Sequence, residues 1–188
     1  ERFWMLETIR DYARERFVDS GEDAQLRHRH VDWYLDLVEA ADLRLDEGGD
    51  QVRQLDRIEA EHDNLRAALE WARDAGEDEL LLRMVAALGN YWDTRGFYQE
   101  LDTWLPLALE RGSSPARARL KLLSWANVQA HAQHDWARSE ALTEEWLRLA
   151  EQEGDEHEVL NAMNSAAINA YASERADFER ARAQFTAI

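Results

Sequence analysis

The spacing of apolar residues between positions 55 and 72 is the strongest constraint on what this chain can fold into. The set consists of Leu55, Ile58, Leu65, Leu69 and Ala72. These residues follow one another at helical intervals, so they lie on one stripe of an α-helix, which repeats every 3.6 residues. His62 falls on the same stripe. Similar segments recur farther along at roughly forty-residue intervals, which favours a series of paired amphipathic helices.

The rest of the sequence also favours helix. Only 2 of 188 residues are Pro and 8 are Gly, and no run of alternating β-branched residues indicates a strand. We therefore expect an all-α protein of about nine helices, separated by short Gly, Ser or Asp clusters that cap helices. At one cluster, Ser114 is the predicted N-cap and Pro115 the predicted first helical residue. The expected breaks lie at residues 19–21, 48–50, 75–77, 95–96, 112–115, 134–135, 154–155 and 176–177.

Charge and cysteine content exclude several classes of function. The formal net charge is −17 at pH 7, which repels a phosphate backbone, so direct nucleic-acid binding by this segment is not expected. The absence of Cys excludes disulfides, thiolate metal sites and cysteine nucleophiles. No signal peptide or membrane-spanning run is evident, and we expect a cytoplasmic location without membrane association.

Three units in the C-terminal part follow a helix-turn-helix pattern, at residues 77–112, 115–154 and 155–188, with the last unit truncated. The first closely resembles a tetratricopeptide repeat. Gly89 and Ala108 fill its small positions, and Trp92, Tyr98 and Leu105 its large ones. In the later units Asn127 and Asn169 replace the glycine, and Trp146 replaces Ala108. We expect antiparallel helical hairpins stacked as a tetratricopeptide-like right-handed solenoid, with self-association possible through the open end.

An antiparallel helix pair is expected upstream of the repeats, at residues 22–45 and 50–75. Before it, residues 3–6 are apolar and compatible with a short strand that leads into a helix beginning at Thr8. The pair would start the stack of hairpins. The expected apolar face of its first helix consists of Leu26, Trp33, Leu37, Val38, Ala41 and Leu45.

Three motifs occur in a fixed order in the first part of the chain. They are Arg2-Phe3-x-Met5-Leu6-Glu7-Thr8-Ile9-Arg10-x-Tyr12-Ala13-x-Glu15-Arg16, Leu26-Arg27-x-Arg29-His30-x-x-x-Tyr34-Leu35, and the stretch from Leu55 to Leu69. Together they resemble the region after the nucleotide-binding module in bacterial LuxR-type and AfsR-type transcriptional regulators of the signal-transduction ATPase (STAND) class. The resemblance implies that residues 1–19 are the tail of a winged-helix module and that the helical sensor begins at Glu22. We expect residues 20–76 to form a hairpin that links to the repeats at residues 77–188.

No motif in the sequence supports chemistry. A P-loop is absent and Lys121 is the only lysine, so ATP binding does not carry over from the resemblance. Glu59 and His62 have Glu-x-x-His spacing, but a di-iron site needs further glutamates and a second such motif. His131 and His134 have no evident additional ligands. We therefore interpret His62 as a packed histidine bonded to a neighbouring helix, and expect no catalytic, cofactor or metal site.

Candidate binding residues are those that the repeat pattern places on the concave side of each unit's first helix. Their mixture of polar and small side chains suits a peptide or small-molecule groove, although a solvated surface has a similar composition. The set comprises Arg83, Asn90, Asp93, Thr94, Lys121, Ser124, His131, Ser173 and Glu174.

The resemblance and the repeats together suggest a non-catalytic sensor segment of a multidomain transcriptional regulator. It would bind a protein or small-molecule inducer in the groove and couple this binding, through the winged-helix module, to ATPase and DNA-binding modules that the sequence does not contain. The alternative is a constitutive tetratricopeptide scaffold that holds a protein or peptide without switching. A helical-bundle metalloenzyme is a distant third hypothesis.

Overall fold

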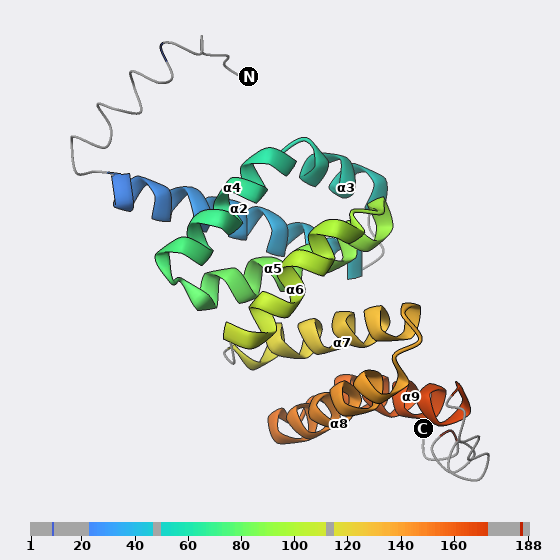
Figure 1. Ribbon diagram of the computed structural model, residues 1–188. Coiled ribbons are helices and arrows are strands. Elements are labelled where there is room, and N and C mark those ends of the chain that lie inside the picture. The colour runs from blue at the N-terminus through green and yellow to red at the C-terminus, as the bar shows by residue number, and fades with distance from the viewer. Residues whose placement is uncertain (1–8, 10–22, 47–49, 112–114, 173–184, 186–188) are drawn as a thin grey trace.

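The structure, a computed structural model, describes residues 9, 23–46, 50–111, 115–172 and 185 (Figure 1). This part of the chain is all-α and contains no strand, as the sequence predicts. The predicted strand at residues 3–6 and the predicted winged-helix tail at residues 1–19 lie outside it, apart from Ile9. None of the described helices is long and apolar enough to span a membrane. The helices are α2 (Asp23–Asp46), α3 (Gln51–Glu59), α4 (His62–Ala75), α5 (Asp78–Arg95), α6 (Tyr98–Arg111), α7 (Ala116–Ala132), α8 (Trp136–Glu153) and α9 (Glu156–Ala172).

Helices that are consecutive in the sequence pack against each other from α4 to α9. Helix α2 contacts α3, α4 and α5, so the first helices of the described chain share one core (Figure 1). The first helices of successive pairs also touch, because α5 contacts both α2 and α7, and α7 contacts α9. A continuous row of packed helices therefore connects the N-terminal part of the chain to its C-terminal part.

The prediction of one helix over residues 50–75 is wrong, because the segment breaks into α3 and α4 between Ala60 and Glu61. The break falls in the seven-residue interval between Ile58 and Leu65, where the apolar stripe has no aliphatic member. Side chains stabilise it: Oε2 of Glu61 accepts hydrogen bonds from the Tyr34 hydroxyl at 3.0 Å and from Nδ2 of Asn64 at 2.6 Å. Both short helices thereby keep their apolar residues against α2.

The buried face of α2 differs from the predicted one. Leu26 and Trp33 are 42% and 53% exposed, although both were expected in the core, and the side chain of Leu45 is outside the described part. The buried stripe runs instead through positions three and four residues apart, and Trp33 points away from it because it follows Val31 by only two positions. The stripe comprises Val31, Tyr34, Leu35, Leu37, Val38, Ala41 and Asp42.

Helix α5 is the most deeply buried element in the centre of the fold, and Gly89 lies on it. A Cβ atom at Gly89 would overlap the indole ring of Trp125 on α7, so the absent side chain permits a close approach of the two helices. Ala108, Trp92 and Leu105 are also buried, as predicted.

The prediction that Tyr98 fills a large core position is wrong. Tyr98 is the first residue of α6 and its side chain is 57% exposed. The preceding Phe97 packs against the core instead, with its ring 4.6 Å from the His62 ring and 5.4 Å from the Tyr91 ring. The turn residue before the helix therefore supplies the aromatic contact that the repeat pattern assigns to the helix itself.

The asparagines that replace glycine in the later units belong to a buried polar cluster between α7, α8 and α9. Nδ2 of Asn127 donates to the Ser139 and Thr143 hydroxyl oxygens at 2.9 and 2.6 Å, while Oδ1 accepts from the Ser165 hydroxyl at 2.6 Å. Asn169 accepts from the Ser139 hydroxyl at 2.7 Å and donates to Thr143 Oγ1 at 3.1 Å. Each polar side chain is satisfied, so the cluster fixes the register of three helices without leaving an unpaired buried group.

Most helix ends in the described part agree with the sequence. Gly76, Gly96 and Gly154 end helices with φ near +70°, a left-handed conformation that favours glycine. Asp135 caps α8 as expected, accepting a hydrogen bond from Arg138 N at 3.1 Å. One position differs: Pro115 is the extended N-cap of α7 and not its first residue. Ser114 lies outside the described residues.

We expect Gly89→Ala to destabilise the protein by about 1–3 kcal/mol, because overlap with Trp125 outweighs the roughly 1 kcal/mol gain in helix propensity. Urea unfolding measures this change. In a Trp125→Ala background the overlap is absent, so Gly89→Ala should become neutral or stabilising. Destabilisation of equal size in both backgrounds would contradict a close contact between these two residues.

Asn127→Ala should cost about 1–3 kcal/mol, since it leaves buried hydroxyl groups of Ser139, Thr143 and Ser165 without their amide partner. Thermal and urea unfolding would measure the loss. Asn164→Ala, at an exposed position of α9, is the matched control and should change stability little. Equal effects of the two substitutions would show that the buried cluster contributes nothing specific.

Candidate functional site

A groove of about 710 Å³ runs between helices that are far apart in the sequence. Three of the predicted concave residues, Asn90, Lys121 and Ser124, line it. They come from two helices, α5 and α7. The other lining residues are Asp42, Arg117, Leu120, Trp125, Glu153, Asp155, His157, Glu158 and Asn161.

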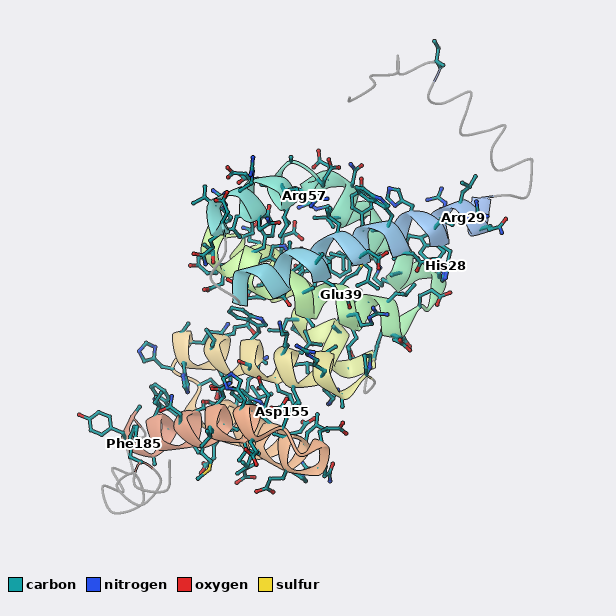
Figure 2. All side chains as sticks on the ribbon, turned by 180° about the vertical axis from the view of Figure 1, so that it is seen from behind. His28, Arg29, Glu39, Arg57, Asp155 and Phe185 are labelled. Atoms are coloured by element: carbon teal, nitrogen blue, oxygen red, sulfur yellow. The ribbon has the colours of Figure 1, made fainter. Side chains whose placement is uncertain are left out.

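A smaller hollow of about 220 Å³ lies between α2, α5 and α7 and contains a fourth predicted residue, Arg83. It shares Asp42, Arg117 and Lys121 with the larger groove, so the two hollows adjoin. In Figure 2, Glu39 marks the α2 side of the smaller hollow and Asp155 the α9 side of the larger groove. The lining residues of the two hollows come from α2, α5, α7, α8 and α9.

Two ion pairs join α2 to the repeats at the wall of the groove. Nζ of Lys121 on α7 donates a hydrogen bond to Oδ2 of Asp42 on α2. Arg83 on α5 donates two hydrogen bonds of 2.8 Å to the carboxylate of Glu39, and these bonds raise the pKa of the Arg83 guanidinium. Asp42 is only 7% exposed, so its charge depends on a paired cation. The only lysine of the chain thus holds α2 against α7.

Acidic residues also line the groove. Glu153, Asp155 and Glu158 surround the turn between α8 and α9. Two of these carboxylates already have structural roles, since Asp155 caps α9 by accepting from Glu158 N at 3.1 Å, and Glu158 accepts from Trp146 Nε1 at 2.8 Å. The groove therefore offers both cations and carboxylates, which suits a polar ligand.

The other predicted site residues do not gather with this set. Asp93 and Thr94 lie near the end of α5, where the Thr94 hydroxyl donates to Oδ1 of Asn90 at 3.1 Å. His131 lies farther along α7, with Nε2 2.6 Å from Oδ1 of Asn169 in the buried polar cluster. Ser173 and Glu174 are outside the described residues. Five predicted residues are thus either peripheral to the groove or not described.

Sequence reasoning missed Asp42, Arg117, His157 and Asn161 as lining residues. Asp42 carried a usable signal, because it is an acid within the apolar stripe of α2, where a charge requires a partner. The other three carry no signal in the sequence, since they lie at the ends of helices that meet only in the fold. No group of three or more potential metal ligands converges within the part of the chain that the structure describes.

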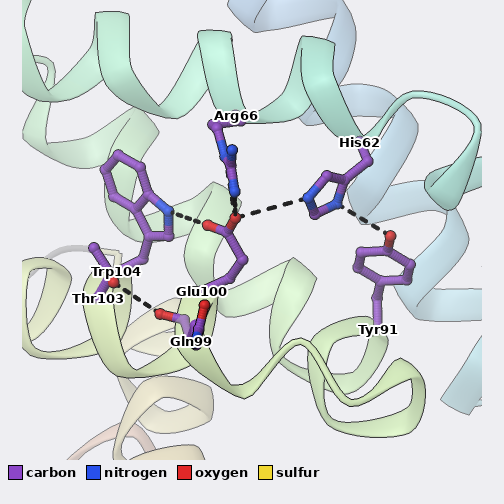
Figure 3. Close-up of polar contacts among 7 residues, drawn as sticks. All are labelled: His62, Arg66, Tyr91, Gln99, Glu100, Thr103 and Trp104. Carbon is purple, nitrogen blue, oxygen red and sulfur yellow. Dashed lines mark hydrogen bonds and ion pairs between the residues drawn. The ribbon is translucent and has the colours of Figure 1, made fainter.

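A second polar centre surrounds Glu100, between α4 and α6 (Figure 3). Its carboxylate accepts hydrogen bonds from Arg66 and from Nε1 of Trp104, the latter at 2.9 Å. Nε2 of His62 lies 3.7 Å from the same carboxylate, and Nδ1 lies 3.2 Å from the Tyr91 hydroxyl. His62 is therefore a half-buried packing histidine bonded to a neighbouring helix, as the sequence predicts. The Glu100 centre connects α4 to α6.

The surroundings of Glu100 and Tyr91 shift the pKa values of both side chains. Burial alone would raise the pKa of the Glu100 carboxyl group, but hydrogen bonds from Arg66 and Trp104 and the charge of Arg66 outweigh it and lower this pKa. Burial and the nearby charge of Glu59 raise the pKa of the Tyr91 hydroxyl. At neutral pH the centre consequently combines an ionised Glu100 with a neutral Tyr91.

Glu100→Gln should destabilise the protein at pH 7 by about 1–3 kcal/mol, because charge-assisted hydrogen bonds to Arg66 and Trp104 are weakened. The folded pKa is lowered, so the stabilisation is complete above the ordinary value of 4.5 and is lost as pH falls through the folded pKa. Urea unfolding from pH 7 to pH 3 should show a smaller acid loss in Glu100→Gln. The control is Glu110→Gln, at an exposed position of the same helix; identical pH profiles for both variants would refute the role of Glu100.

Comparison with known proteins places the chain in a regulatory context. It is 39% identical over 109 residues to proteins named putative HTH-type transcriptional regulators in Mycobacterium tuberculosis and Mycobacterium bovis. The matched region covers 58% of this chain but only 12% of each relative, so the chain spans a small part of their length. No protein-family model matches the chain, and no solved structure does.

Proposed function

We propose that this chain is a non-catalytic sensor segment of a multidomain transcriptional regulator of the LuxR or AfsR type. Its helices form a tetratricopeptide-like solenoid that binds an inducer, either a protein or a small molecule, in the groove between α2, α5, α7 and α9. Binding is coupled to ATPase, winged-helix and DNA-binding modules elsewhere in the full-length protein. The segment itself requires no cofactor and acts in the cytoplasm, where such regulators meet DNA.

The observation that carries this proposal is the convergence of Asn90, Lys121 and Ser124 on one groove. These residues come from two successive helix pairs, and a ligand among them would contact both pairs at once. The similarity to HTH-type regulators independently supports a regulatory setting. Consecutive and alternate packing of the helices supports a solenoid, since repeats of this kind contact mainly their neighbours.

The ion pairs at the groove give a route from binding to the rest of the regulator. A ligand with an anionic group competes with Asp42 for Lys121, and one with a cationic group competes with Lys121 for Asp42. Either competition weakens the link between α2 and α7 and changes the balance between two positions of α2. Ligand binding shifts such an equilibrium only by its difference in affinity for the two positions, so the ion pair sets the size of the response.

Ser124→Trp tests the groove by filling it with a large side chain at a half-buried position. In a transcription reporter controlled by the full-length regulator, we expect inducer-dependent transcription to fall at least roughly tenfold, corresponding to about 1.4 kcal/mol of lost binding. Thr103→Trp, at an exposed position of α6, introduces the same side chain away from the groove and should respond normally.

The result also separates the sensor from the constitutive scaffold. A scaffold that holds a partner without switching should change its basal transcription in Ser124→Trp while the ratio of induced to uninduced transcription stays the same. A normal response in Ser124→Trp, with the protein folded by circular dichroism, would contradict ligand binding in this groove.

A further inference from the structure

A separate surface lies between the N-terminal half of α2 and helix α4. A hollow of about 580 Å³ is lined here by Leu26, Arg27, Arg29, His30, Ala67 and Trp71. We call these residues, together with Trp33, the α2–α4 surface. It does not share a lining residue with the groove, whose α2 residues are Glu39 and Asp42. Figure 2 shows Arg29 near the N-terminal end of α2, well separated from Glu39.

The apolar part of this surface is unusually exposed for an amphipathic helix. Leu26 and Trp33 lie seven residues apart and therefore share one side of α2 with His30, yet both are largely exposed. The Trp33 ring is held edge-on to the Tyr34 ring, with centroids 4.6 Å apart, and Tyr34 is itself buried. An exposed tryptophan in a fixed position loses little entropy on contact, which is why tryptophan is enriched among binding hot spots.

The charged part of this surface has the opposite sign to the chain as a whole. Arg27 and Arg29 are its charged members, and none of the described residues that line the hollow is acidic. His28 turns toward acids of its own chain, with ring nitrogens 3.7 Å from Asp32 and 4.0 Å from Glu77. Arg27, Arg29 and His30 border the same hollow as the apolar Leu26 and Trp71. The local chemistry combines cations with an apolar pocket.

We propose that the α2–α4 surface docks a short acidic protein segment, which inserts an apolar side chain between Leu26 and Trp71 and places carboxylates against Arg27 and Arg29. Charge complementarity selects the acidic segment. A nucleic acid is disfavoured because a long polyanion extends beyond the surface and meets the other charges of a chain with net charge −17. A short segment avoids them, since charges more than about 8 Å away are largely screened at physiological salt.

The test is selection of a random twelve-residue peptide display library on the full 188-residue chain. We expect enriched peptides to combine Asp or Glu with at least one large apolar residue. Synthetic versions should bind Arg29→Glu and Trp33→Ala at least tenfold more weakly than the unchanged protein. The matched controls are Arg53→Glu and Val52→Ala, both at exposed positions of α3, which should retain binding. Circular dichroism and melting temperatures check that each variant is folded.

Several outcomes would overturn the proposal. These are failure to enrich peptides, enrichment of neutral or basic peptides, and binding that Arg29→Glu leaves unchanged. Binding that appears only after deletion of residues 1–22 would instead assign the surface to the chain's own N-terminal residues. Ser124→Trp should bind the peptides normally, so failure of this proposal is distinguishable from failure of the groove as a sensor site.

Discussion

The close approach of α5 and α7 at Gly89 and Trp125 is the contact on which the arrangement of the described helices depends. Helix α5 packs against α2, α4 and α6 on one part of its surface and against α7 on another, so it belongs to both ends of the fold. A side chain at Gly89 would push α7 away, because the indole already occupies that space. The groove exists in its observed form because α2, α5 and α7 are held at this short separation.

Polar interactions between side chains then determine how neighbouring helices are aligned on this apolar core. Glu100 joins α4 to α6, Lys121 joins α7 to α2, and Asn127 joins α7 to α8 and α9. Apolar packing is non-directional, whereas each of these groups is satisfied in only one register. Of the three, the Lys121 pair borders the groove, so it is the contact that a bound ligand can disturb.

The regulatory context and the groove provide complementary information about function. Similarity to HTH-type regulators indicates the kind of protein in which such a segment occurs, but the match covers only a small part of those relatives. The groove has a polar lining of both charge signs, while the α2–α4 surface combines arginines with apolar side chains. We propose that the segment couples the binding of a ligand in the groove to a protein contact at the α2–α4 surface.

The sequence by itself determined the helical class and most of the turns, because helical periodicity and capping residues are local properties. It also indicated that Gly89 is a position where a small residue allows two helices to approach closely. The tertiary structure decided the break at Glu61, the exposure of Leu26 and Trp33, and the replacement of Tyr98 by Phe97 in the core. It also decided that Asp42 meets Lys121, 79 residues away. Each depends on contacts between distant segments, and the sequence pattern of one helix contains no information about its neighbour.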